Sequence, residues 1–193
     1  MPWKKNFDVD DTLRKAGEAF WTHGYEATSM QTLLEAMGIQ KGSFYDTYGS
    51  KRDAYLRSLE QYLDERFGAF ETLAEGLSSR EGLEAQLAAI RDECLGAEGH
   101  RGCMIANCAL ELAHDDVAAQ RIVQRGFERH RALLASQLRG AQAEGQVSAT
   151  LDADALGTAI LGLVLGMRSF ARSGAPAAAI HTLHDQALEL LER

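Results

Sequence analysis

Proline is almost absent from this chain of 193 residues, which contains only Pro2 and Pro176. Roughly 170 consecutive residues therefore lack the side chain that breaks helices most strongly. The glycines follow no fixed period, and no segment alternates apolar and polar residues over the length of a strand. These absences exclude a collagen-like chain and favour an all-α fold, and 46% apolar residues are enough to fill a core.

Cysteine is also sparse: Cys94, Cys103 and Cys108 are the only three, and none belongs to a CxxC motif. This set suits neither a disulfide framework nor a structural zinc site, so any cysteine chemistry should be that of free thiols. His181 and His184 are three residues apart and could share a metal on a helix, but the sequence places no third ligand near them. We therefore expect surface or interface histidines, no metal site and no other cofactor.

Long apolar runs are missing as well. The longest, residues 159–167, is about half of the roughly 20 residues that a helix needs to span a bilayer. The N-terminus, MPWKKNFDVDD, turns acidic where a secretory signal needs an apolar stretch, so a cytoplasmic location is expected. The chain carries a net charge of −8 with a pI near 5.2. That balance argues against coating nucleic acid by bulk attraction, although it permits a local DNA-reading surface.

Charge is unevenly divided along the chain. Residues 1–53 hold seven basic and eight acidic side chains, a net charge of −1, which leaves −7 for the remainder. The simplest interpretation is an N-terminal module that can approach DNA, attached to an acidic body that does not lie on it. Lys4 and Lys5 could form an arm in the minor groove, but a solvated tail is favoured.

Helical spacing of the apolar residues predicts about nine helices. The second and third are short and pivot on the turn at Gly38 and Ile39, which is typical of a helix-turn-helix. The predicted helices cover residues 10–24, 29–38, 40–48, 50–75, 83–94, 101–114, 117–143, 152–172 and 176 onward. We expect a helix-turn-helix domain over residues 1–49 and a helical body over residues 50–193, with the helix over 50–75 connecting them.

The segment GYEATSMQTLLEAMGIQKGSFYDTYGSKRDAY, residues 24–55, resembles the N-terminal DNA-binding segment of the tetracycline-repressor (TetR) family. The likeness rests on the aromatic residue after Gly24, the hydroxyl residues that open the second helix, and the run from Lys41 to Tyr45 on the third. One departure is Tyr48, where the family usually has phenylalanine. The resemblance implies a one-component transcriptional regulator, usually a repressor. Such a protein binds a palindromic operator as a homodimer and is released when a small-molecule inducer enters its helical ligand-binding and dimerisation body.

The third predicted helix also suits the major groove on physical grounds. A recognition helix needs an exposed face without bulky apolar groups and hydrogen-bonding side chains near its N-terminus. A glutamine can bond an adenine edge in two places, and the start of a helix suits a phosphate. The candidate DNA contacts are Thr28, Ser29, Gln40, Lys41, Gly42, Ser43, Tyr45, Tyr48 and Lys51. The plain alternative is a small helical unit whose polar side chains are merely solvated, but their combined spacing favours DNA binding.

Residues 101–116 look like the sixth-helix segment of one branch of this family, some of whose members respond to electrophiles or oxidants through a cysteine. The matching position is Cys103, near Arg101 and a predicted helix start, where positive potential favours a thiolate. A packing role for Cys103 is the open alternative, and Cys94 and Cys108 fall on core stripes. The same stretch is apolar on nearly all sides, which predicts a buried helix. The candidate sensor or ligand contacts are Cys103, Asn107, Phe127 and His130.

Small side chains form a strip along the helix predicted over 152–172. They are Ala155, Ala159, Gly162 and Gly166. We expect the last two helices to form a homodimer interface, as the resemblance implies, with packing inside one chain as the alternative. Two other classes of protein are disfavoured. A helical enzyme or carrier lacks support because the chain has no HExxH motif, phosphate loop or nucleophile and base pair, so no catalytic residues are predicted. A protein-interaction adaptor does not need the polar group on the third helix.

Overall fold

The computed structural model describes residues 7–192, and within them all regular structure is helical, with nine α-helices. This confirms the predicted all-α fold; Lys4 and Lys5 lie outside the described residues. The helices are α1 (Val9–His23), α2 (Met30–Met37), α3 (Lys41–Tyr48), α4 (Lys51–Ala74), α5 (Ser79–Leu95), α6 (Met104–Glu111), α7 (Val117–Ala143), α8 (Ala153–Ser173) and α9 (Ala177–Glu189). A 3-10 turn, η1 (Gly99–Arg101), precedes α6.

These helices cluster into two compact units. The first unit comprises Met1–Glu65 with Asn107–Val123, and the second comprises Arg66–Ala106 with Gln124–Arg193. The division therefore falls inside α4, and the end of α6 and the start of α7 join the N-terminal unit. The sequence suggested a boundary at residue 49 instead, because one uninterrupted helix pattern gives no sign of which of its turns pack against which neighbours.

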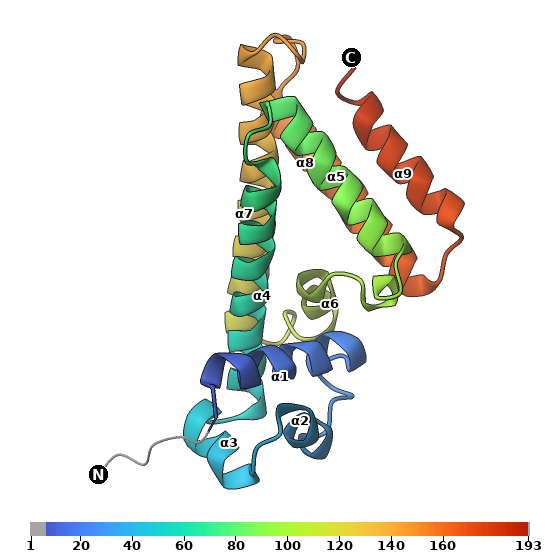
Figure 1. Cartoon of the computed structure of the whole chain (residues 1–193). Coiled ribbons are helices and arrows are strands. Elements are labelled where there is room, and N and C mark those ends of the chain that lie inside the picture. Colours follow the sequence, from blue (N-terminus) through green and yellow to red (C-terminus); the bar gives the residue numbers. More distant parts are fainter. Residues whose placement is uncertain (1–6, 193) are drawn as a thin grey trace. The chain divides into compact units, whose positions relative to one another are not determined.

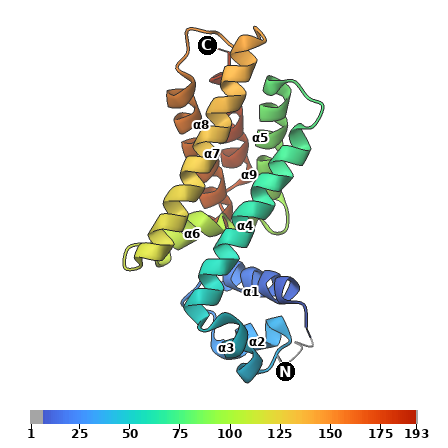
Figure 2. The same cartoon turned by 90° about the vertical axis from the view of Figure 1, so that its left-hand side faces the viewer.

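Capping fixes the ends of the short helices in the first unit. Asp8 caps α1 by accepting hydrogen bonds from two N–H groups of its first turn, and Ser29 caps α2 by accepting one from Thr32. Helix α2 ends at Gly38, whose φ of 67° lies in the left-handed region, so the chain can turn directly into α3. In Figures 1 and 2, α2 and α3 lie beside each other on the same side of α1.

Aromatic side chains form the centre of the first unit. Phe20 of α1, Phe44 of α3 and Tyr55 of α4 are each exposed by 2% or less. The rings of Phe20 and Tyr55 meet edge to face with centroids 5.0 Å apart, and Tyr25 lies 4.8 Å from Tyr55. Large rings bury more apolar area than other side chains, so the contact of Phe20 with Tyr55 holds the start of α4 against α1.

In the second unit, α8 and α9 form an antiparallel pair, and α5 packs against both (Figures 1 and 2). Helix α8 also approaches α7 closely at Gly157, where an added Cβ would lie 3.2 Å from the backbone nitrogen of Ala135. By length and composition, α8 is the one helix of the described residues that could cross a membrane. Core helices of soluble proteins pass the same test, and α8 packs against α5 and α9 with 44% of its apolar stretch buried.

Helix α6 is shorter and less buried than the sequence predicts. It spans Met104–Glu111 rather than residues 101–114, because η1 and Gly102, with a φ of 67°, occupy the preceding positions. Cys108 is 0% exposed, whereas Leu110 is 88% exposed. The helix therefore has one buried and one exposed face, and the predicted burial on nearly all sides is wrong.

Candidate DNA-binding surface and regulatory body

The outer face of α3 carries most of the predicted DNA contacts. Of the predicted contacts, Gln40, Lys41, Gly42 and Tyr45 are exposed and Ser43 is half-buried; the acidic Asp46 of the same helix is exposed as well. On the opposite face, Phe44 is fully buried, and its ring centroid lies 5.4 Å from that of Tyr48. Tyr45 is 43% exposed, and its ring leans edge-on against Phe44. The helix thus has its polar side chains on the exposed face and Phe44 on the buried face.

The start of α3 is open to a ligand on its outer side. Gln40 occupies the N-cap position, but its side chain makes no capping hydrogen bond. The amide is therefore available to a base edge, which it can contact with both its donor and its acceptor. An added Cβ at Gly42 would meet nothing within 4 Å, so the packing of the first unit does not require glycine there. Glycine instead leaves room for a close approach of the helix backbone to another molecule.

Lys51, the first residue of α4, lies over the ring of Tyr25. Its Nζ is 4.5 Å from the ring centroid and 3.5 Å from the carbonyl oxygen of Glu26. The cation–π contact restricts where the ammonium group can lie. At the same helix start, the N–H of Asp53 donates to Ser50 Oγ at 3.0 Å, and that hydroxyl donates to the Asp53 carboxylate at 2.7 Å. The lysine is thus fixed beside a well-capped helix N-terminus.

The two hydroxyl residues before α2 differ in exposure. Ser29 is exposed, and its Oγ accepts a hydrogen bond from the N–H of Thr32 at 3.0 Å. Thr28 is 0% exposed, and its hydroxyl donates to the carbonyl oxygen of Gly24 at 2.6 Å. The side chain of Thr28 is therefore bonded inside the first unit, at the end of α1, and does not face outward as a DNA contact would.

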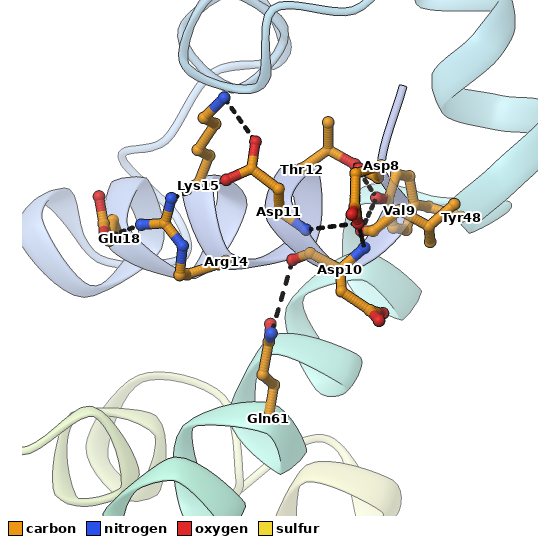
Figure 3. A network of polar contacts seen from close by, with 10 residues as sticks. All are labelled: Asp8, Val9, Asp10, Asp11, Thr12, Arg14, Lys15, Glu18, Tyr48 and Gln61. Carbon is orange, nitrogen blue, oxygen red and sulfur yellow. Dashed lines mark hydrogen bonds and ion pairs between the residues drawn. The ribbon is translucent and has the colours of Figure 1, made fainter. Parts of the chain in front are cut away.

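Tyr48 also lies inside the first unit, unlike the sequence-based assignment to DNA. It is 3% exposed, and its hydroxyl donates to the carbonyl oxygen of Val9 at 2.9 Å and lies 2.6 Å from Thr12 Oγ1 (Figure 3). Burial raises the pKa of this phenol above its usual value, so it stays neutral. Arg57 stacks 5.0 Å above the ring centroid. The hydroxyl of Tyr48 is hydrogen-bonded inside the first unit, so Tyr48 does not face outward as the predicted DNA contact would.

Two acidic residues far along the chain contact the turn after α1 and the start of α4 within the first unit. Glu111 Oε2 accepts a hydrogen bond from the N–H of Tyr25 at 2.8 Å. Asp116 Oδ1 accepts one from Arg52 Nη2 at 2.8 Å, and Oδ2 accepts another from Nε of the same guanidinium. This pairing lowers the pKa of Asp116 to about 2. Neither contact can be recognised in the sequence, because partners 86 and 64 residues apart form no local pattern.

In the second unit, His130 lies among aromatic rings. The centroids of Phe67 and Phe70 are 6.1 and 5.5 Å from its ring, and its Nε2 is 2.9 Å from Gln86 Nε2. An amide nitrogen can only donate, so Nε2 accepts and the imidazole is neutral. Burial lowers the pKa of His130 to about 4. Gln86 is 1% exposed, and its Oε1 finds no hydrogen-bond partner in the described part of the chain.

The other predicted ligand contacts are spread over both units. Cys103 and Phe127 are half-buried in the second unit, whereas Asn107 belongs to the first, so the candidates do not form one cluster within a unit. Cys94 and Cys108 are buried, and burial raises the pKa of both thiols, that of Cys108 to about 11. Between residues 7 and 192, no group of three histidine, cysteine or acidic side chains could hold a metal ion.

The strip of small side chains on α8 lies largely at the surface of the second unit. Ala155, Ala159 and Gly162 are exposed, and an added Cβ at Gly162 would meet nothing within 4 Å. Gly166 differs because it faces α9. Further along the helix, Phe170 is 42% exposed. An apolar helix face left uncovered in a single chain has the character of an interaction surface.

A helix-turn-helix with an exposed outer face on its second helix, followed by a purely helical unit, is the arrangement of a DNA-binding regulator. The chain belongs to the tetracycline-repressor (TetR) family. Residues 13–56 match the model of the bacterial regulatory proteins of the tetR family, and residues 80–186 match the tetracyclin repressor-like C-terminal domain. The fold and the family predicted from the sequence are thereby confirmed.

Similar proteins are named as regulators. The uncharacterized HTH-type transcriptional regulator YezE of Bacillus subtilis (strain 168) is 37% identical over 135 residues, which are 67% of this chain and 65% of that protein. The chain thus spans slightly less than two thirds of that relative. The HTH-type transcriptional repressor ComR of Escherichia coli (strain K12) is 30% identical over 174 residues, 89% of this chain and 82% of that protein.

A solved structure extends this likeness to a complex with DNA. It contains a cysteine mutant of the TetR family transcriptional regulator CifR bound to 26bp double-strand operator DNA. Its TM-score is 0.84 at 27% sequence identity, and the match covers 96% of this chain and 98% of that chain. The likeness thus includes a protein that holds operator DNA.

Proposed function

We propose that this protein is a cytoplasmic transcriptional repressor that binds a palindromic operator as a homodimer and has no catalytic activity. The observation that carries the proposal is the outer face of α3, where Gln40, Lys41 and Gly42 are exposed while Phe44 fixes the helix from inside. The proposed DNA contacts are Ser29, Gln40, Lys41, Gly42, Ser43, Tyr45 and Lys51.

These contacts have two different roles. Gln40 reads a base edge in the major groove, which gives sequence preference. Lys41, Tyr45 and Lys51 bind phosphate oxygens, which gives affinity and orientation without sequence preference. The near-neutral charge of residues 1–53 supports this division, because binding then depends on a few placed cations rather than on bulk attraction.

Dimerisation is proposed because one recognition helix contacts too few base pairs to be specific. A helix of eight residues reads only a few base pairs, so two copies and a palindrome are needed for specificity. The exposed strip of α8, together with α9, is the surface proposed to join the two copies. Its small side chains allow close packing of helices from both chains.

The inducer is proposed to act on the helical body. His130 and Gln86 offer a neutral hydrogen-bonding pair beside Phe67 and Phe70, which suits a largely apolar molecule with one polar group. Alternatively, an electrophile reacts with Cys103. Either event releases the operator only if it favours a dimer in which the two recognition helices no longer match the half-site spacing.

The proposal is tested by selecting bound sequences from a random DNA pool with the full-length protein. We expect enrichment of one palindrome, and binding to it should weaken steeply with salt because phosphate contacts release counterions. A scrambled duplex of equal length serves as the control. Enrichment of no sequence, or equal binding of the scrambled duplex, would refute the proposed function. Compounds that release the selected operator can then be sought in the same assay.

A further inference from the structure

The position of Lys51 depends on Tyr25, whose ring lies 4.5 Å from the ammonium group. Tyr25 lies in the connection between α1 and α2, two residues after the end of α1. Its ring is supported on one side by Tyr55, with centroids 4.8 Å apart. Its backbone is held by Glu111, whose carboxylate accepts the Tyr25 N–H at 2.8 Å. Glu111 of α6 thus holds the backbone of Tyr25, and the ring of Tyr25 in turn contacts the ammonium group of Lys51.

Glu111 fits closely into this turn. At Gly24, where φ is 87°, an added Cβ would lie 2.9 Å from Glu111 Oε1, so the turn and the carboxylate leave no space between them. Five residues later, Asp116 binds the guanidinium of Arg52, the residue directly after Lys51. The segment that carries Glu111 is therefore held against the start of α4 at a second point. All of these residues belong to the first unit.

We propose that Glu111 is a positioning residue for DNA binding, which holds Tyr25 so that the Lys51 ammonium is directed at an operator phosphate. The inference rests on the proposed function, because it assumes that Lys51 contacts DNA. A restrained lysine loses less side-chain freedom when it binds a phosphate than a freely moving one does. Glu111 would then strengthen DNA binding although its own charge is negative.

The direction in which operator affinity changes when Glu111 is removed distinguishes a positioning role from simple charge repulsion. A carboxylate near DNA repels phosphates, so its removal should strengthen binding when it has no other role. Positioning predicts the opposite result for Glu111→Ala. Asp115 supplies the matched control, because it is an exposed carboxylate four residues further along the same segment. Asp115→Asn should leave operator affinity unchanged or raise it slightly.

The experiment measures the affinity of the full-length protein for its selected operator by fluorescence anisotropy. Glu111→Ala should weaken binding about three- to tenfold, whereas Glu111→Gln, which keeps an acceptor for the Tyr25 N–H, should stay within about twofold of wild type. In a Lys51→Ala background, Glu111→Ala should cause almost no further loss. In a Lys41→Ala background, its full effect should remain, because Lys41 does not rest on Tyr25.

A second pair of variants covers the case in which Glu111→Ala disturbs folding. Tyr25→Phe keeps the ring under Lys51 and should bind like wild type, whereas Tyr25→Leu removes the cation–π contact and should weaken binding. Thermal unfolding shows whether each variant is folded at the assay temperature. Tyr25→Leu should also lower the salt dependence of binding, as Lys51→Ala does.

The possible results distinguish this inference from the proposed function. If wild-type protein binds its operator but Glu111→Ala is as tight as Asp115→Asn, the positioning role is refuted. Equal losses from Glu111→Ala in the presence and absence of Lys51 would also refute it, because the two residues would then act independently. If the wild type selects no DNA at all, the proposed function fails and this inference fails with it.

Discussion

The hydroxyl of Tyr48 donates a hydrogen bond to the carbonyl oxygen of Val9 at 2.9 Å, and so joins the last residue of α3 to the first residue of α1. Arg57 of α4 also binds the end of α3, because its guanidinium donates to the carbonyl oxygen of Thr47 at 3.2 Å. At the middle of α3, the side chain of Phe44 is fully buried. The direction of the recognition helix is thus set within the first unit.

Removing the Tyr48 hydroxyl should therefore affect stability. Tyr48→Phe removes this donor from the half-buried Val9 carbonyl and takes the phenol partner away from the buried Thr12 hydroxyl. We expect a loss of about 1 to 2 kcal/mol in the free energy of unfolding, measured with denaturant. Tyr45→Phe is the matched control, because its exposed hydroxyl has no such task; it should change stability by less than about 0.5 kcal/mol and weaken DNA binding instead. An unchanged unfolding free energy in Tyr48→Phe would contradict this role.

Burial of His130 predicts a pH dependence of stability. Its pKa in the folded protein is about 4, below its usual 6.5, so the unfolded chain binds the proton more readily. The stability that neutral His130 contributes is therefore fully present above about pH 6.5. As the pH falls from there towards about 4, the free energy of unfolding decreases by at most about 1.4 kcal/mol per pH unit. Unfolding curves of His130→Gln should lack this loss. Parallel stability profiles for variant and wild type between pH 7 and 4.5 would argue against a buried neutral histidine.

The sequence predicts the helices well because their signals are local. Ser29, Gly38 and Pro176 mark helix ends by capping, a left-handed turn and a fixed φ, and these residues stand where α2 and α9 begin or end. The outer face of α3 is also local, since residues three and four apart share a helix face. Ser29, Gln40, Lys41 and Tyr45 are accordingly exposed.

Other properties depend on contacts between distant segments. Whether Tyr48 faces DNA or the core is decided by Thr12 and Val9, which are 36 and 39 residues away. Likewise, the acidic residues Glu111 and Asp116 resemble ordinary surface carboxylates in the sequence. Only the fold shows that they contact the turn after α1 and the start of α4.

The exposed strip on α8 leads to a prediction about assembly. Gly162→Glu adds a charged side chain to this strip, where one chain alone has open space, so it should disrupt the dimer without a clash inside the monomer. Gly68→Glu on α4 is the matched control, because an added Cβ there also meets nothing within 4 Å. Sedimentation at micromolar concentration should show dimers for wild type and Gly68→Glu, and monomers for Gly162→Glu. A monomeric wild type would refute the proposed interface.

The thiols should differ in reactivity. Cys94 and Cys108 are buried with raised pKa values, whereas Cys103 is half-buried, so Cys103 should be alkylated first under brief, limited labelling. Mass spectrometry of the labelled peptides gives the order. If Cys103 is a sensor, electrophiles should release the operator from wild type but not from Cys103→Ser. Equal labelling of all three thiols, or normal release from the variant, would leave Cys103 with a packing role only.

The central claim, that α3 reads DNA through its outer face, is tested most directly by competition binding with single-base variants of the selected operator. Wild-type protein should discriminate at every contacted base pair, and Gln40→Ala should lose about 1 to 3 kcal/mol of discrimination at one position in each half-site. Lys41→Ala should instead weaken binding to all variants alike, because phosphate contacts carry no sequence preference. If Gln40→Ala keeps the full discrimination profile of the wild type, α3 does not read the operator as described.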